Sequence, residues 1–160
     1  MDLEFKVINL ERDFDSCVAA RKDAYLCSFG HYEGFDDFLT GYRERIAERL
    51  LLQEWSYVHV WNGKNIAGQL EFRTFSSEPR TGYIHLIYLK PEYRGLGLAQ
   101  QLQDHIFSVL LKASCNRAIL SVSRSNQRAL NFYQRNGWKY CRPNPKHAET
   151  DYYESVLLVE

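Results

Sequence analysis

The residues with the clearest chemical potential form a glycine-containing turn, Arg-Gly-Leu-Gly-Leu-Ala, at residues 94–99. An apolar run ends at Pro91 before the turn, and a helical pattern follows it. A helix start presents free backbone N–H groups and the positive end of the helix dipole, which both suit a phosphate group. Gly95 and Gly97 let the backbone approach an anion closely, and Arg94 can add a charge-assisted contact. The turn predicts a phosphate site, although an ordinary strand-to-helix turn looks the same.

A second segment, residues 122–138, reads as a strand end, a short loop, a helix and a glycine stop. Asn126 and Tyr133 are separated by two helical turns, so both side chains are expected to face the same way. Ala129 between them is small, which permits close approach of a ligand. Gly137 suits the left-handed position that ends many helices.

Together the two segments resemble the GNAT superfamily of N-acetyltransferases. The acetyl-CoA loop of that family has the form R/Q-x-x-G-x-G/A, which is matched by Arg94, Gly97 and Ala99. Its later helix carries N-x-x-A-x-x-x-Y followed by a glycine and an aromatic residue, matched by Asn126, Ala129, Tyr133, Gly137 and Trp138. The motifs have the family's order and separation. The resemblance covers roughly residues 65–141, and the first 60 residues carry no signature of the family.

The resemblance implies acetyl-CoA as co-substrate, with no metal. Backbone groups near Ile87 and Leu89 would pair with the pantetheine arm, and Asn126 would bond it as well. The expected binding residues are Ile87, Leu89, Arg94, Gly95, Leu96, Gly97, Leu98, Ala99, Asn126 and Tyr133. The five histidines and four cysteines show no spacing typical of metal ligands.

Amide formation from a thioester needs a neutral amine, stabilisation of the developing oxyanion, and a proton for the departing thiolate. The resemblance implies Tyr133 as the acid and the N–H of Leu89 as the oxyanion donor. Strand alternation predicts Tyr83, His85, Ile87 and Leu89 on one face. Several members of the family carry a glutamate or histidine at the position of His85 as general base, often working through water. An ordinary histidine, with a pKa of about 6.5, suits that role.

A purely structural role is the alternative for each of these residues. His85 could serve packing within an apolar strand, and Tyr133 could be a core tyrosine of an amphipathic helix. Glu71, beside Arg73 on the preceding strand, is the rival base or amine anchor, and could equally be a solvated charge at a sheet edge.

The acceptor amine is specified less well. By the resemblance, it would contact the segment after the first strand and the last hairpin. Aromatic and acidic residues there suit a cationic amine: His31, Tyr32, Glu33, Phe35, Asp36, Asp37, His147, Glu149, Asp151, Tyr152 and Tyr153. Phe35 as a core residue, with both aspartates as helix-start charges, is the slightly better explanation of the first group.

The composition limits the class of protein. A chain of 160 residues predicts a single domain over 1–160. Twenty basic and twenty acidic residues give a net charge of zero, which argues against nucleic-acid or anionic-membrane partners. No signal peptide and no apolar run long enough to span a membrane is present, so the cytoplasm is expected. The four separated cysteines are expected to be buried free thiols.

The expected fold is α/β (α+β), with a mixed, splayed GNAT-type sheet of about seven strands flanked by about four helices. Strands are predicted at 3–8, 55–61, 65–75, 82–89, 117–122, 138–141 and 152–159. Helices are predicted at 11–29, 35–52, from the glycine turn to 113, and at 126–136. Asn62 and Gly63 predict a hairpin, and the later β-α-β-α-β order predicts parallel pairing.

These patterns predict an N-acetyltransferase that transfers the acetyl group of acetyl-CoA to a primary amine, small-molecule or peptide, by direct attack in a ternary complex. No covalent acyl-enzyme is expected, because no cysteine or serine has a convincing nucleophile setting. The alternative is a non-catalytic acyl-CoA-binding module that regulates a partner. A homodimer is possible, since an edge strand such as 152–159 invites pairing.

Overall fold

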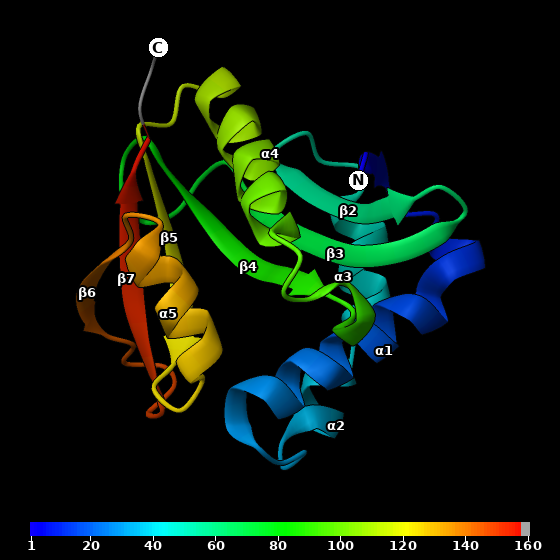
Figure 1. The fold of residues 1–160 in the computed structure, drawn as a ribbon, viewed down its shortest axis with the longest axis horizontal. Coiled ribbons are helices and arrows are strands. Elements are labelled where there is room, and N and C mark those ends of the chain that lie inside the picture. The colour runs from blue at the N-terminus through cyan, green and yellow to red at the C-terminus, as the bar shows by residue number, and fades with distance from the viewer. Residues whose placement is uncertain (158–160) are drawn as a thin grey trace.

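The computed structural model describes residues 1–157 as one seven-stranded sheet with helices on both faces (Figure 1). The strands are β1 Glu4–Val7, β2 Trp55–Asn62, β3 Asn65–Arg73, β4 Thr81–Leu89, β5 Arg117–Ser123, β6 Lys139–Pro143 and β7 Thr150–Val156. The helices are α1 Leu10–Phe29, α2 Phe35–Leu39, α3 Tyr42–Arg49, α4 Leu98–Lys112 and α5 Gln127–Arg135, with a 3-10 turn at Pro91–Tyr93. The strand order is β1-β2-β3-β4-β5-β7-β6. Because β4 and β5 pair in parallel and the other described pairs are antiparallel, the predicted mixed sheet is confirmed.

Two predicted elements need correction. The single helix predicted at 35–52 is two helices, because Thr40 is extended and Gly41 is left-handed, with φ of 77°. A left-handed residue cannot continue a right-handed helix. The strand predicted at 152–159 is not an edge, because β7 lies between β5 and β6; its predicted end at 158–159 lies outside the described residues. The edge on this side of the sheet is β6, whose Lys139 and Pro143 are typical of edges that resist pairing. The homodimer stays a prediction.

The composition-based expectations are met in part. Cys17 and Cys115 are buried free thiols, whereas Cys27 is exposed and Cys141 is partly exposed. The expectation of four buried thiols is therefore wrong for these two. None of the helices within residues 1–157 is both long enough and apolar enough to cross a membrane.

The helices divide the core between the two faces of the sheet. Leu102, Ile106 and Leu110 of α4 are fully buried against a cluster that includes Leu70 and Phe72 of β3. On the other face, α1 and α3 pack against β2 in a second cluster, built on Cys17, Tyr42, Ile46 and Tyr57. Each fully buried aliphatic side chain contributes about 1.5–3 kcal/mol. These clusters hold the central strands rigid on both sides.

The sheet splits between β4 and β5. The two strands pair only over the first four residues of each, from Thr81 with Arg117 to Ile84 with Leu120. Beyond Ile84 they diverge, and Figure 1 shows the open V between β4 and the β5–β7–β6 unit. The split begins at a β-bulge, because β3 residues 71 and 72 lie opposite Leu86 and Ile84, which leaves His85 as the extra residue. A bulge interrupts the ladder and increases local twist.

The bulge also moves side chains to unexpected faces of β4. Ile84 packs in the α4 cluster, whereas Leu86 and Tyr88 pack against Ala20 of α1. The prediction that Tyr83, His85, Ile87 and Leu89 share one face is therefore wrong. Ile87 and Leu89 pack toward α4, whereas His85 stacks on Trp55 of the α1–α3 cluster. One extra residue reverses the alternation, because side chains in a strand alternate with a period of two.

Glu71 of β3 is a buried anion, with only 1% of its surface exposed. It forms an ion pair with Arg21 of α1. The Tyr42 hydroxyl and the Gln69 amide donate to its Oε2 over 2.5 and 2.7 Å. A buried carboxylate needs such partners because it has lost its hydration. The interpretation of Glu71 as a solvated edge charge is wrong; it ties α1 and α3 to the sheet.

Glu71→Gln keeps the side-chain volume but leaves Arg21 without a counter-ion. Because an unpaired charge in a buried site is strongly destabilising, we expect the free energy of unfolding to fall by about 3–5 kcal/mol in urea titrations. Glu44→Gln, at an exposed position of α3, is the control and should change it by less than about 0.5 kcal/mol. Equal stabilities of the two variants would show that the ion pair does not support the fold.

Candidate active site

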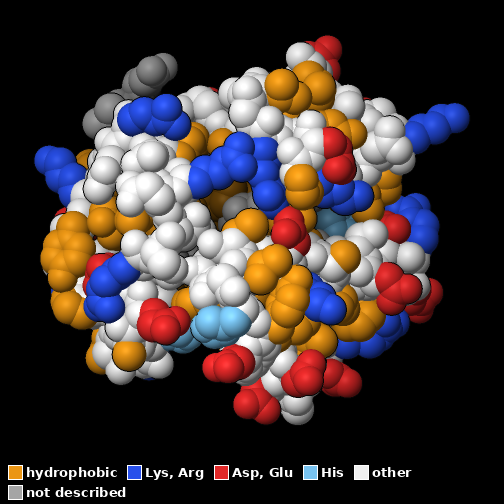
Figure 2. Space-filling model, turned by 60° about the horizontal axis from the view of Figure 1, so that its bottom comes forward, with side chains coloured by type: hydrophobic (Ala, Val, Ile, Leu, Met, Phe, Trp, Pro, Cys, Tyr) orange, Lys and Arg blue, Asp and Glu red, His pale blue; other side chains and the backbone are white. Residues whose placement is uncertain are grey.

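A cavity of about 810 Å³ passes through the split between β4 and β5. On one face of the sheet it is lined by the glycine turn, the start of α4, and α5. On the other face it is lined by Ala24, Cys27 and Ser28 of α1, and residues 85–89 of β4 run between the two. Its volume lies within the range typical of small-molecule sites. In Figure 2, basic side chains gather around a hollow in the surface above the acidic lower rim.

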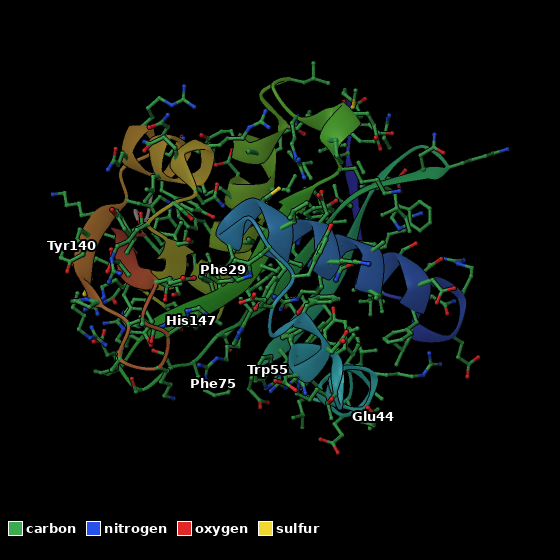
Figure 3. All side chains as sticks on the ribbon, turned by 90° about the horizontal axis from the view of Figure 1, so that it is seen from below. Phe29, Glu44, Trp55, Phe75, Tyr140 and His147 are labelled. Carbon is green, nitrogen blue, oxygen red and sulfur yellow. The ribbon has the colours of Figure 1, made fainter. Side chains whose placement is uncertain are left out.

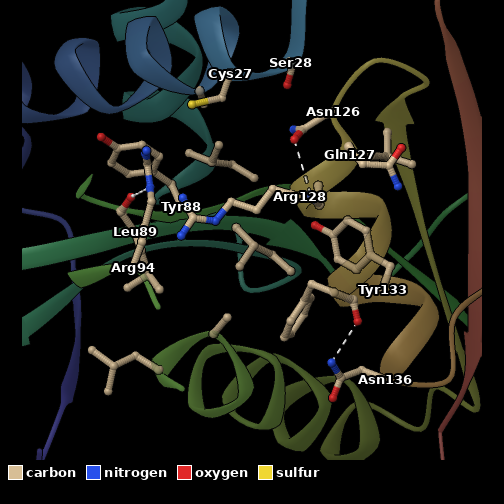
Figure 4. Close-up of a pocket in the computed structure, with 18 of the residues that line it drawn as sticks. Cys27, Ser28, Tyr88, Leu89, Arg94, Asn126, Gln127, Arg128, Tyr133 and Asn136 are labelled. Carbon is tan, nitrogen blue, oxygen red and sulfur yellow. Dashed lines mark hydrogen bonds between the residues drawn. The ribbon is translucent and has the colours of Figure 1, made fainter. Parts of the chain in front are cut away.

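Most of the predicted donor-binding residues lie together in this cavity. Its lining includes Ile87, Leu89, Arg94, Gly95, Gly97, Leu98, Ala99, Asn126 and Tyr133, and also His85. Leu96 is outside the lining, with 57% of its surface exposed. The two sequence motifs are thus brought to opposite walls of one space, as Figure 4 shows for Arg94 and Tyr133.

The glycine turn leaves open space in front of α4. Gly95 and Gly97 have φ of 76° and 78°, a conformation that glycine adopts without strain. A Cβ atom placed on either residue would meet nothing within 4 Å. Gly97 is the N-cap of α4 and supplies no side-chain cap. The first N–H groups of the helix therefore face the cavity without a side-chain acceptor, which suits an anion.

The guanidinium group of Arg94 is already bonded to other residues of the protein. Its Nη2 lies 2.6 Å from Oδ2 of Asp23 in α1, and its Nε donates to the carbonyl oxygen of Leu89 over 3.0 Å. The same Asp23 carboxylate accepts a hydrogen bond from the Tyr88 hydroxyl. Arg94 therefore positions the turn against α1 and the end of β4, and its direct contact with a phosphate stays a prediction.

The cavity carries positive charge. Its lining contains no Asp or Glu, and its cations are Arg94, Arg128 and Arg135. Arg128 projects from α5 across the cavity in Figure 4. The sequence analysis missed Arg128, although it lies two residues after Asn126 within the recognised motif. Within residues 1–157, no group of three or more His, Cys, Asp or Glu side chains is arranged to hold a metal ion.

The end of β4 offers backbone groups to the cavity. The Lys90 N–H donates to the Ala67 carbonyl oxygen over 2.8 Å. Hydrogen-bonded pairs alternate along an antiparallel ladder, so residues 88 and 90 bond to β3 while the N–H and C=O groups of Ile87 and Leu89 point away from it. They point toward β5, whose pairing with β4 has already ended at Ile84. The Leu89 carbonyl oxygen already accepts from Arg94, so a ligand in the cavity can pair with the Ile87 groups and the Leu89 N–H.

Asn126 and Tyr133 line the same cavity, which confirms that both face the same way. Asn126 caps α5, since its Oδ1 accepts from the Ala129 N–H over 3.3 Å. The ring of Tyr133 packs edge-on against Trp138 at 5.5 Å, and its hydroxyl points into the cavity (Figure 4). Burial raises the pKa of Tyr133 to about 12. The hydroxyl thus stays protonated and is a hydrogen-bond donor across the neutral range.

His85 is enclosed by aromatic and basic groups. Its ring stacks on Trp55 at 5.3 Å and contacts Tyr83 at 4.7 Å. Its Nε2 accepts a hydrogen bond from Nε of Arg73 over 3.1 Å. Burial and then Arg21, Arg73 and Arg49 lower the pKa of His85 to about 3. The imidazole is therefore neutral but weakly basic, with its lone pair engaged. The rival base Glu71 is likewise held by its donors.

The comparisons with known proteins agree with this geometry. Residues 17–138 match the sequence model of the acetyltransferase (GNAT) family. The match covers well over half of the chain, so this protein belongs to the GNAT family of acetyltransferases.

Individual relatives are distant. The chain is 31% identical over 75 residues to bovine thialysine N-ε-acetyltransferase, covering 47% of this chain and 35% of that protein. It is 34% identical over 83 residues to an uncharacterized N-acetyltransferase of Methanocaldococcus jannaschii, covering 49% and 51%. The matches thus span about a third to a half of the length of these relatives. The PaiA N-acetyltransferase of Thermoplasma acidophilum, solved with coenzyme A, shares the fold with a TM-score of 0.79 at 16% identity, over 98% of this chain and 99% of that one.

The lowered pKa of His85 predicts a pH effect on stability. Between about pH 6.5 and about pH 3 the unfolded chain binds a proton at His85 that the folded chain does not, so stability is lost as the pH falls through this window. His85→Gln keeps an acceptor for Arg73 but cannot titrate. We expect the wild type to lose more stability than this variant between about pH 7 and about pH 5 in urea titrations.

The exposed His147→Gln is the control and should follow the wild type. Parallel curves for the wild type and His85→Gln would contradict a lowered pKa of His85.

Proposed function

We propose that this protein transfers the acetyl group of acetyl-CoA to a primary amine by direct attack within a ternary complex. The observation that carries the proposal is the single cavity through the split sheet, which joins the anion-binding turn to the β4 backbone and Tyr133. Family membership supports the reaction class. A relative named for acetylation of the ε-amine of thialysine supports an amine as acceptor.

The residues of the cavity suit the parts of acetyl-CoA. The open helix start and Arg128 suit its phosphates, because they offer N–H groups and a positive charge. The backbone groups of Ile87 and Leu89 suit the amide-bearing pantetheine arm, and the Asn126 amide can add a further bond. When bound, acetyl-CoA supplies the thioester that the amine attacks.

Two groups would serve the chemistry from opposite walls. The N–H of Leu89, with that of Ile87, would stabilise negative charge on the thioester oxygen. The Tyr133 hydroxyl would donate to the departing sulfur. His85 could act as general base only after its Nε2 leaves Arg73. With that bond intact, the amine passes its proton to water, and His85 serves as the wall of the cavity on the α1 face.

A thiol-release assay with acetyl-CoA and a panel of primary amines tests the proposal. We expect release that depends on both the amine and the protein. Coenzyme A binding by calorimetry, without release for any amine, would instead support the non-catalytic acyl-CoA-binding module.

Tyr133→Phe removes only a hydroxyl and keeps the ring packed against Trp138. Loss of a proton donor to the leaving group costs about 10²–10⁴-fold in rate, so turnover should fall by that factor while coenzyme A affinity changes little. Tyr140→Phe, which removes a hydroxyl from a side chain on β6 with 54% exposure, is the control and should keep full turnover. Near-full turnover of Tyr133→Phe would remove Tyr133 from the role of acid.

A further inference from the structure

Arg49 and Arg73 lie near His85, a residue of the cavity lining, and lack a carboxylate partner among residues 1–157. The Nη1 of Arg49 donates to the Tyr57 hydroxyl over 2.9 Å, and its guanidinium lies 3.9 Å from the Trp55 ring centre. Arg73 donates its Nε to His85. Its guanidinium faces the rings of Trp55, Phe75 and Tyr83 at 5.5, 4.8 and 5.1 Å. Within residues 1–157 neither arginine forms an ion pair.

Several other arginines have a carboxylate partner. Arg21 pairs with Glu71, Arg94 with Asp23, and Arg142 with Glu78. Arg49 and Arg73 are partly buried, so they have lost hydration without gaining a counter-ion. Burial lowers the pKa of Arg73, and Arg49 lowers it further. Both guanidinium groups lie within 5.5 Å of the Trp55 ring centre without a counter-ion, so an anion bound beside this ring would stabilise them.

Both guanidinium groups are linked to His85, Arg73 by its hydrogen bond and Arg49 through the Trp55 ring on which His85 also stacks. His85 lines the cavity and bonds to Arg73, so Arg73 lies one side chain beyond the cavity on the α1 face. The opposite face is occupied by the turn, α4 and α5, which leaves the α1 face for the amine. Figure 3, from below, labels Trp55 and Phe75, whose rings meet edge-on at 5.8 Å.

The acidic residues predicted to hold a cationic amine lie elsewhere. Glu33, Asp36, Asp37 and Glu149 are exposed, and within residues 1–157 none of their carboxylates bonds to His85 or to either unpaired arginine. Asp151 is buried and paired with Arg124. Phe35 is 4% exposed and belongs to the core, which confirms the structural explanation of that residue. The side chains next to His85 therefore favour an anionic group on the acceptor over a second cation.

We propose that the acceptor is a small amine that also bears a carboxylate, and that Arg49 and Arg73 bind this carboxylate beside the face of Trp55. This inference rests on the proposed function and names its substrate class. Planar guanidinium groups bind carboxylates through paired, charge-assisted hydrogen bonds. Arg73 still has both terminal nitrogens for this purpose, since only its Nε is committed to His85.

Matched amines that differ only by the carboxylate test the proposal: L-lysine and cadaverine, L-ornithine and putrescine, β-alanine and ethylamine. In the thiol-release assay we expect kcat/KM to be at least about tenfold higher for the carboxylate member, because charged hydrogen bonds of this kind are worth that much or more. Arg73→Gln and Arg49→Gln should each remove most of this preference through KM. Arg43→Gln, exposed on α3, should keep it.

A binding measurement separates failure of this inference from failure of the proposed function. Glutarate, added to the ¹⁵N-labelled protein without any amine, should shift the Nε–H signals of Arg49 and Arg73 in a saturable way and leave that of Arg43 unchanged. Absence of thiol release with every amine would contradict the proposed function while this titration still tests the carboxylate site. Equal or better use of the decarboxylated amines, or unmoved arginine signals, would overturn the inference.

Discussion

Strands that pair along their full length leave no room for a ligand between them, because every inner N–H and C=O group is already bonded. In this protein one extra residue at His85 breaks that rule. After it, β4 stays bonded to β3 but parts from β5, so its outer backbone groups face a cavity. The glycine turn follows the same strand, and α5 follows the strand across the split. Turn, helix and backbone thus converge because the bulge separates two strands.

The ion pairs around the cavity then decide which charges stay free to bind a ligand. Asp23 holds Arg94 against the end of β4, and Glu71 holds Arg21 beneath the sheet. Both pairs fix helix α1 to the central strands, and both remove ionisable groups from direct chemistry. Among the described residues, the cations left unpaired here are Arg128 and Arg135 in the cavity lining, and Arg49 and Arg73 next to His85. Positive charge at both ends suits a phosphorylated donor and an acceptor with an anionic group.

Burial and nearby charges change the chemical character of the predicted residues. Position alone favours His85 as a base, but burial, followed by the charges of three arginines, lowers its pKa to about 3. The pKa of Tyr133 shifts upward, to about 12, because burial favours the neutral form of its hydroxyl. A neutral imidazole and a protonated phenol both avoid charge inside the protein. The split sheet therefore favours hydrogen-bond donation over strong base chemistry.

The sequence by itself determined the local features: the turn at Gly95 and Gly97, the left-handed Gly137 after α5, and the order of strands and helices. Each depends on neighbours in the chain, through backbone freedom, capping and periodicity. Only the tertiary structure decided the bulge at His85, because no residue type in β4 predicts it. The bulge in turn decided which side chains share a face of β4. It also decided the charge partners. Glu71 and Arg21 are fifty residues apart in the chain, and no local pattern predicts which distant charges the packing of helices on the sheet brings together.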